Sequence, residues 1–382
     1  MMYIYVNYYL FTFVFIFMIQ ARYLSPENLA KHLATWKKEL DVFEIGHSVC
    51  HRPIHIVRLG RGKVNVFMWS QMHGNESTTT RALLKLIPWM QEITQKDLLE
   101  ELCIHIIPQL NPDGAAAYTR ENANGVDLNR DAIALSQPES QCLRNYFDAL
   151  QPQYCFNLHD QRTLYGAGEK GEAATLSFLA PAADKERSTL PARKKAMQLI
   201  ATIVDKIGSE LPQGIGRFDD TFNPNCVGDT FSALEVPTLL FEAGHFSDDY
   251  ARNKTTYFVE KALREALWAI ALGEYNKQSV SSYFQVPENQ KVFNDILLEG
   301  VCLEVSGKIL KNQYLIIQYL EQLKEQKLYF LPQMISYSAN PPGGRFHKTI
   351  SLSSNLSQIE LPFAINKILQ NRGFDKLLSI KH

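Results

Sequence analysis

The sequence predicts an α/β domain with a central sheet, followed by a smaller β-rich module. Between residues 23 and 272, apolar runs of strand length alternate with segments that carry apolar residues at helical spacing. The last helical segment ends at Gly273, a common helix stop, and a polar, Ser-rich stretch follows at residues 276–282. Beyond it, short apolar runs and a turn-forming segment at residues 340–344 are typical of β structure.

Each predicted strand is a short apolar run bounded by polar or turn-forming residues. We expect strands at residues 44–49, 55–59, 64–70, 103–110, 154–158 and 238–241. Helices are expected where apolar residues recur every three or four positions, at residues 26–40, 78–91, 138–150, 192–211 and 255–272. The last helix is the clearest, because Val259, Ala262, Leu263, Ala266 and Ile270 form one apolar stripe.

These boundaries divide the chain into an apolar leader (residues 1–21), a main domain (22–275) and an appended C-terminal module (276–382). Within the module, residues 301–305 and 328–331 are expected to be strands, whereas residues 314–323 fit either a helix or a strand. No cluster of His, Asp and Glu marks the module as catalytic. The chemistry is therefore expected in the main domain.

The leader has competing interpretations. Residues 1–19 are almost entirely apolar or aromatic, and no Lys or Arg precedes them, although an export signal usually begins with positive charge. The run is an export signal or anchor, a membrane span, or the product of a mistaken upstream start. A start near Met18 predicts a cytoplasmic protein, whereas the other readings predict an exported or membrane-anchored one. Contact with a membrane is expected only if the run is real and retained.

Charge and cysteine content narrow the function classes. The chain has 39 basic and 40 acidic residues and a net charge of −1, which argues against a nucleic-acid partner and favours a small or peptide substrate. Its cysteines are scattered singly without a CxxC pair, three of them (Cys103, Cys155 and Cys302) within predicted strands or strand-like runs. We expect reduced thiols in the core rather than disulfides or a thiolate zinc site.

The segment Met72-His73-Gly74-Asn75-Glu76-Ser77 follows a buried strand and precedes a helical pattern. A turn there brings His73 and Glu76 toward one metal ion, although His-x-x-Glu alone also occurs by chance in surface turns. His159 ends another apolar run, and strand ends gather at one edge of an α/β sheet. Imidazole and carboxylate ligands of this kind leave one coordination position open in catalytic zinc sites.

Other histidines fit such a site less well. His51 and His55 have helical i,i+4 spacing, but Pro53 between them disfavours the helix that this spacing needs. We expect both to be surface or strand residues. Glu242, which closes the apolar run at 238–241, is the expected general base, because an acidic residue there is costly unless it is paired or faces a cleft. His245 is a weaker alternative base.

Two arginines follow the turn at residues 111–114. Arg120 and Arg130 lie on a loop rich in turn-forming residues, between the two segments that carry candidate ligands. A planar guanidinium suits both an oxyanion and a substrate carboxylate. As isolated loop residues, both arginines would also be consistent with solvated surface charges.

Taken in order, these motifs resemble the zinc metallocarboxypeptidase family of the carboxypeptidase A and B type, in its short-loop bacterial form. The resemblance covers about residues 45–272 and implies a mixed eight-stranded sheet between helices. It implies one zinc ion with His73, Glu76 and His159 as ligands. The Phe-Glu dipeptide of the family, which carries its general base, is similar to Phe241-Glu242.

The resemblance also assigns the substrate-facing residues. Asn129 and Arg130 would hold the terminal carboxylate of a peptide, and Arg120 would polarise the scissile carbonyl. Asp127 is similar to the residue that orients the first zinc histidine. The implied partner is a peptide or a small amide with a free carboxylate, and the implied reaction is removal of the C-terminal residue.

Two departures from the family concern the substrate. The family usually carries a mobile Tyr about two dozen residues before the catalytic Glu, but residues 216–222 contain Phe and no Tyr. The position that sets side-chain preference in the family falls near Val227-Gly228-Asp229. The match there does not show whether an apolar or a basic substrate side chain is preferred. Asp219 and Asp220 would either attract a basic group or form a solvated turn.

Two other functions stay open. The first is an amidohydrolase of the same fold that acts on a small acyl-amino acid or a cell-wall peptide. The second is a binding module that kept the fold but lost activity.

Overall fold

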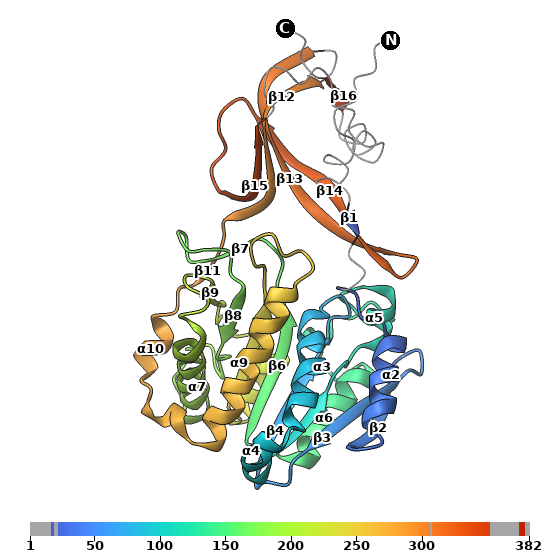
Figure 1. Cartoon of the computed structure of the whole chain (residues 1–382), viewed down its shortest axis with the longest axis vertical. Helices are drawn as coiled ribbons and strands as arrows, with labels where there is room; N and C mark the ends of the chain where they lie inside the picture. Colours follow the sequence, from blue (N-terminus) through green and yellow to red (C-terminus); the bar gives the residue numbers. More distant parts are fainter. Residues whose placement is uncertain (1–16, 19–21, 306–307, 352–373, 379–382) are drawn as a thin grey trace. The chain divides into compact units, whose positions relative to one another are not determined.

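The computed structural model describes residues 17–18, 22–305, 308–351 and 374–378. These residues form two compact units (Figure 1). One unit is Leu24–Gln290, and the other combines described residues of Met1–Tyr23 with those from Lys291 onward. The first unit continues to Gln290 because Tyr283 and Val286 pack into its core. The domain division at residues 275 and 276 stays a prediction.

The first unit is built on an eight-stranded sheet. The pairs at its centre run parallel, whereas β2, β3 and β8 join their inner neighbours antiparallel. Its strand order is β2 (Asp41–His47), β3 (Pro53–Leu59), β5 (Leu102–Ile107), β4 (Val64–Ser70), β6 (Tyr154–Asp160), β10 (Thr238–Ala243), β8 (Leu176–Leu179) and β9 (Ile215–Arg217). The mixed eight-stranded sheet implied by the resemblance is confirmed.

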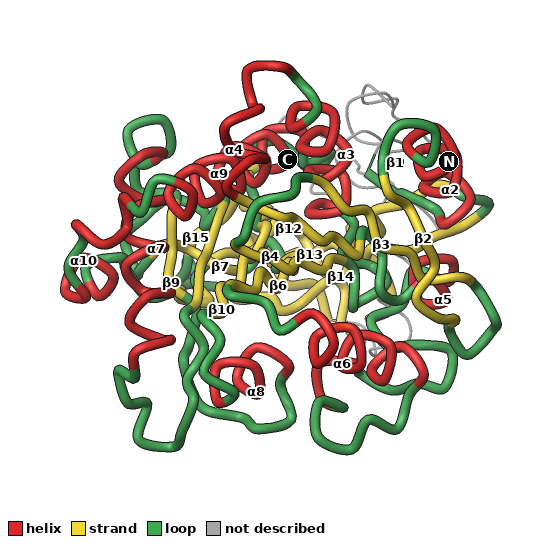
Figure 2. Tube along the Cα trace, turned by 90° about the horizontal axis from the view of Figure 1, so that it is seen from below, coloured by secondary structure: helices red, strands yellow, loops and turns green. Residues whose placement is uncertain are grey.

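Helices cover both faces of this sheet (Figure 2). Alternation along β4 explains how: Val66 and Met68 point into one core, and Phe67 and Trp69 into the other. The first core is covered by α2 (Pro26–Trp36), α3 (Thr78–Met90), α4 (Lys96–Glu101), α7 (Pro191–Ile207) and α9 (Asn253–Ala271). The second is covered by α6 (Pro138–Leu150) and α8 (Val227–Ala233).

Shorter elements complete the first unit. They are α5 (Pro112–Ala117), α10 (Val280–Phe284), the 3₁₀ turns η1 (Ile93–Gln95), η2 (Leu128–Arg130) and η3 (Glu274–Lys277), and the two-stranded sheet of β7 (Tyr165–Ala167) and β11 (Asn289–Lys291). Every strand and helix predicted for the main domain is present, within a few residues at each end. The short elements β7, β8, β9, α4, α5 and α8 were not predicted, because so few residues carry no clear period.

The second unit is a β sheet, which confirms the predicted C-terminal β-rich module. Its strands are β1 (Phe17–Met18), β12 (Phe293–Val305), β13 (Lys308–Lys324), β14 (Lys327–Ser338), β15 (Arg345–Ser351) and β16 (Phe374–Leu378). The ambiguous segment at 314–323 lies in β13 and pairs with β14 throughout. Between these strands, Glu325 and Gln326 both have positive φ, as a tight two-residue hairpin requires.

Most of the predicted leader, residues 1–16 and 19–21, lies outside the described residues. Phe17 and Met18 pair with Phe330 and Tyr329 of β14. Among the described residues, no helix combines the length and the apolar character that crossing a membrane requires. The interpretations of the leader therefore stay predictions. The described cysteine side chains are free thiols: Cys142 and Cys155 are buried, Cys103 and Cys226 are half-buried, and Cys50 is exposed, so the expected place in the core holds for only some of them.

Candidate metal centre and active site

The candidate ligands meet at the carboxyl end of three neighbouring strands. His73 and Glu76 lie in the turn between β4 and α3, and His159 is the penultimate residue of β6. Glu242 lies beside His159, because the parallel register of β6 and β10 pairs these two residues. The crevice at the carboxyl ends of parallel strands is where α/β proteins usually build their sites.

Three side chains converge closely enough to hold one metal ion. Each of His73, Glu76 and His159 is buried, and their ligand atoms lie within 4.8 Å of one another. The Nδ1 atoms of the two imidazoles are 3.2 Å apart. The Glu76 carboxylate lies 2.9 Å from Nδ1 of His73 and 3.0 Å from Nδ1 of His159. Two imidazole nitrogens and one carboxylate aimed at one point are the donor set of a catalytic zinc site.

Asp127 contacts the ring nitrogen of His73 that does not face the other candidate ligands. Its Oδ1 atom lies 2.9 Å from Nε2 of His73, which leaves Nδ1 of the ring facing His159. The same oxygen accepts a hydrogen bond of 2.9 Å from the backbone N–H of Asn129 at the start of η2. Burial would raise the pKa of Asp127, but the hydrogen bond and charge of His73 lower it overall. A carboxylate in this position sets the ring orientation of a ligating histidine.

Glu242 is a buried carboxyl group in the same cavity. Burial, followed by the charges of Glu76 and Asp160, raises its pKa well above the usual range. A carboxyl group with a raised pKa is suited to carrying a proton. The described residues that line the cavity do not include His245, which lies buried with its ring centroid 4.7 Å from that of Tyr250.

Asp160 is a buried carboxylate that the sequence analysis missed. It accepts hydrogen bonds from the backbone N–H groups of Thr78 (2.9 Å) and Thr79 (3.3 Å), where α3 begins. Its own N–H donates to Glu76 at 3.1 Å. Asp160 thus ties the end of β6 to the turn that carries two candidate ligands. Its position directly after His159 was the available signal.

The loop residues Arg120, Asn129 and Arg130 line the same cavity as the candidate ligands. Arg120 donates from Nε to Asp127 at 3.0 Å, and its partly exposed side chain lies 3.5 Å from Glu76. Asn129 accepts a hydrogen bond of 3.0 Å from the backbone N–H of Val227. Arg130 donates to the carbonyl oxygen of Asn129 at 2.7 Å. These contacts join the loop to η2 and α8.

One cavity of about 550 Å³ unites the candidate residues. Its lining includes His73, Glu76, Arg120, Asn129, Arg130, His159 and Glu242. Tyr165, Arg162 and Asn157 also line it, and none of them was proposed from the sequence. Asn157 precedes His159 by two positions, so strand alternation places both on one face of the sheet. That period was the signal for Asn157, whereas Tyr165 and Arg162 lie in segments without a period.

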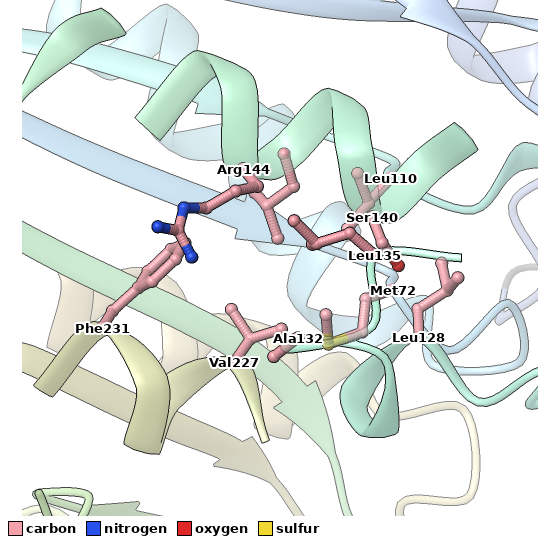
Figure 3. Close-up of a pocket in the computed structure, with 10 residues that line it drawn as sticks. Met72, Leu110, Leu128, Ala132, Leu135, Ser140, Arg144, Val227 and Phe231 are labelled. Carbon is pink, nitrogen blue, oxygen red and sulfur yellow. The ribbon is translucent and has the colours of Figure 1, made fainter. Parts of the chain in front are cut away.

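A second, apolar cavity is lined by side chains from segments next to the site (Figure 3). Met72, Leu128 and Val227 point into it, and each is adjacent or close in sequence to a residue of the site. With about 10 Å³ of room, it is too small for a substrate and at most admits one water molecule. These apolar contacts hold the ligand turn, η2 and α8 against one another.

Of the remaining sequence candidates, Asp219 lines the same cavity, whereas His51, His55 and Asp220 do not. His51 is exposed and His55 is a residue of β3, as expected. Asp220 does not present a free carboxylate, because it pairs with Arg187 (3.1 Å) and Arg193 (2.6 Å). Asp219 is exposed and accepts hydrogen bonds from Thr221.

Asp229 predicts a pH-dependent change in stability. Burial raises the pKa of Asp229 to about 6, and the charge of Asp220 also raises it. The hydrogen bond from the backbone N–H of Asn223 and the charges of Arg193 and Arg130 lower this pKa, but by less. Because the folded-state pKa exceeds the unfolded one, ionisation costs stability progressively from about pH 4 to above pH 6. Asp229→Asn should therefore raise the free energy of unfolding at pH 7.5 by up to about 3 kcal/mol and leave it unchanged at pH 4. Urea denaturation at both pH values measures this, and an equal effect at both would contradict it.

Comparisons with known proteins agree with this geometry. Residues 27–189 match the family model described as zinc carboxypeptidase. Carboxypeptidase SOL1 of Arabidopsis thaliana is 28% identical over 162 residues, which cover 36% of this chain and 33% of that protein. Carboxypeptidase E of Caenorhabditis elegans is 35% identical over 117 residues, 24% of each chain. The chain thus spans about a third or less of the curated relatives that it matches.

Solved structures share the fold. A metallo-carboxypeptidase from Burkholderia cenocepacia superposes with a TM-score of 0.52 at 19% identity, over 66% of this chain and 70% of that one. The carboxypeptidase A from Helicoverpa armigera gives a TM-score of 0.53 at 18% identity, over 66% and 75% of the two chains. Zinc is the metal of the matched family, and the convergent His73, Glu76 and His159 fit it. Over residues 27–189, the chain is therefore similar to the zinc carboxypeptidase family.

Proposed function

We propose that this chain is a zinc-dependent metallocarboxypeptidase that hydrolyses the C-terminal peptide bond of peptides. The observation that carries the proposal is that three side chains able to hold one metal ion line one cavity together with the buried carboxyl group of Glu242 and the side chains of Asn129 and Arg130. The match of residues 27–189 to the zinc carboxypeptidase family model supports the same reaction class.

The ligands proposed for zinc are His73, Glu76 and His159, with Asp127 orienting His73. Zinc bound there would supply Lewis-acid chemistry, which lowers the pKa of water and polarises a carbonyl group. Glu242 would accept the proton of the attacking water and later pass it to the nitrogen of the departing amino acid. Its raised pKa supports this role, because a protonated carboxyl group must persist between the two transfers.

Arg120 and Arg130 would each pair with a different negative charge of the substrate. Arg120 lies beside Glu76 and would stabilise the negative charge that develops on the scissile carbonyl oxygen. Arg130 would hold the free terminal carboxylate together with the side chain of Asn129. The Asn129 side chain accepts a hydrogen bond from Val227 in α8, and Arg130 donates to the carbonyl oxygen of Asn129. Because these contacts fix both residues, the carboxylate and the scissile bond would occupy defined places. Because the substrate must then carry a free carboxylate, cleavage would be restricted to the C-terminal end of a peptide.

The terminal carboxylate provides the test. The zinc-loaded protein should release the last residue of a free peptide and leave the same peptide with an amidated C-terminus intact. Arg130→Met should raise KM and lower kcat/KM by about 100-fold or more, because a charge-assisted pair is lost from the substrate complex. Arg61→Met, which changes an exposed arginine, is the matched control.

Mass spectrometry of peptide digests and initial rates measure these effects. Cleavage of the amidated peptide at the same rate would contradict the carboxypeptidase assignment. Hydrolysis of acyl-amino acids or cell-wall peptides alone would favour the amidohydrolase. A zinc-loaded protein without any hydrolysis would favour a binding module.

A further inference from the structure

One wall of the active-site cavity is built where three strands begin or end. Gln161 follows β6, Tyr165 opens β7 and Phe218 follows β9, and all three line the cavity. The rings of Tyr165 and Phe218 pack together with their centroids 5.6 Å apart. β7 and β9 have three residues each, and β7 belongs to a sheet of only two strands, which is marginally stable by itself. The position of this wall therefore depends on contacts with other segments.

The short segment that reaches Asn289, near the end of the first unit, holds both of these strands. The backbone N–H of Gly168, directly after β7, donates to the carbonyl oxygen of Glu288 at 2.9 Å. The backbone N–H of Arg217 in β9 donates to the carbonyl oxygen of Pro287 at 2.7 Å, and its guanidinium pairs with Glu288 at 2.7 Å. β11 begins at Asn289 and pairs with β7 (Figure 1).

The side chain of Asn289 extends this contact to the end of β6. Its Nδ2 atom donates to Oε1 of Gln161 at 2.9 Å, and its Oδ1 atom accepts a hydrogen bond of 2.9 Å from the hydroxyl group of Ser177. Gln161 and Ser177 are buried, and Nε2 of Gln161 donates to the Ser177 hydroxyl oxygen and to the carbonyl oxygen of Ala174, both at 3.0 Å. Removing Asn289 would leave polar groups of both residues buried and unpaired, which costs more than the bonds themselves contribute.

Gly216 in β9 leaves the room that the Asn289 amide occupies. A Cβ atom built on Gly216 would stand 1.9 Å from Oδ1 of Asn289 and 3.1 Å from its Cγ atom. Non-bonded heavy atoms do not approach to 1.9 Å, so any side chain at this position would displace the amide. A glycine within a strand often marks such a close approach.

We propose that Asn289 is a positioning residue for substrate binding: through Gln161 and the two short strands, it fixes the cavity wall that a bound peptide contacts. The proposal rests on the carboxypeptidase function proposed above. The metal centre is held separately, because His159 and Glu242 lie in the parallel pairing of β6 with the whole length of β10. Loss of the Asn289 amide should therefore weaken substrate binding and preserve the metal centre.

The experiment follows substrate affinity separately from turnover. In the zinc-loaded full chain, Asn289→Ala should raise KM by about tenfold and change kcat by less than about threefold, because the wall binds the substrate but does not react with it. The zinc content should equal that of the wild type. Gln285→Ala, which removes an exposed amide nearby in sequence, is the matched control and should leave KM unchanged.

Gly216→Ala tests the same contact without changing Asn289. Its methyl group should displace the amide and raise KM as Asn289→Ala does. In the double variant the colliding Oδ1 atom is gone, so KM should equal that of Asn289→Ala alone rather than the product of two separate effects. Multiplied effects would show that the two residues act independently and would overturn the proposed fit.

Hydrogen exchange gives a readout that does not depend on hydrolysis. The backbone N–H groups of Gly168 and Arg217 bond to the residues that precede Asn289, so peptides containing them should exchange at least about tenfold faster in Asn289→Ala and at the wild-type rate in Gln285→Ala.

Three outcomes separate the positioning role from the function on which it rests. An unchanged KM in an active Asn289→Ala protein would overturn the positioning role and leave the carboxypeptidase function standing. Loss of zinc, or a lower kcat at unchanged KM, would also overturn it, because the damage would then lie in the metal centre. Faster exchange in Asn289→Ala, when even the zinc-loaded wild type cleaves no peptide, would support the contact and contradict the carboxypeptidase function.

Discussion

Glu242→Gln should lower kcat by about 10³- to 10⁴-fold while the protein keeps one zinc ion per chain. The amide matches the carboxyl group in size, so the cavity keeps its shape, but it cannot accept the proton of the attacking water. Because Glu242 is not one of the three convergent ligands, the metal content should not change. Initial rates on a peptide with a free C-terminus, together with metal analysis of the same sample, measure both quantities.

The matched control for this variant is Glu186→Gln, the same chemical change at an exposed position. It should retain the wild-type rate. A Glu242→Gln variant with a near-wild-type rate would rule out Glu242 as the base. Loss of zinc along with activity would instead place Glu242 among the ligands.

Replacing His159 by alanine should remove both metal and activity. His159 would contribute one of two imidazole ligands, and its Nδ1 atom lies 3.0 Å from Glu76 and 3.2 Å from Nδ1 of His73. Without it, the remaining donors leave a two-ligand site, and we expect zinc affinity to fall by more than about 100-fold. His73→Ala should have the same effect, since Asp127 would then orient no ligand.

Metal analysis after dialysis against a weak chelator measures this loss, and circular dichroism shows whether the fold is retained. His51→Ala serves as the control, because His51 is an exposed histidine outside the site. One equivalent of zinc on the dialysed His159→Ala protein would contradict the ligand assignment. When zinc is added to wild-type protein that a strong chelator has stripped of metal, activity should return together with the full metal content.

The sequence anticipates the main sheet because its central strands are long and apolar. Strands such as β4 and β6 lie between two cores, so almost every position must be apolar, and the run is visible without any tertiary information. The short strands β8 and β9 were missed for the opposite reason. Their few residues are specified by pairing with β10 and with each other, which no local pattern records.

The candidate site was also anticipated in large part. Seven of the proposed residues line one cavity, and Asp127 contacts His73 and Arg120. Each follows a recognisable strand or turn, and the order of the motifs carried the resemblance. Their catalytic roles remain predictions that the variants above test.

The surroundings of Asn157 and Asp229 could not be predicted from the sequence. Asn157 stands inside an apolar strand, where the sequence alone suggests only a tolerated polar residue, and Asp229 stands in the first turn of a short helix. Their meaning depends on which neighbours satisfy their hydrogen bonds. That is decided by register between β6 and β10 and by the packing of α8 over this face.

By itself, the sequence determined the α/β class, the order of the long elements and the residue types capable of holding zinc. These follow from hydrophobic period and side-chain chemistry, which are local properties. Only the tertiary structure decided which donors converge and which carboxylates are already paired, as Asp220 is with its arginines. The reason is physical: a ligand set or a specificity pocket consists of distances between segments far apart in the chain, and the strand register sets those distances.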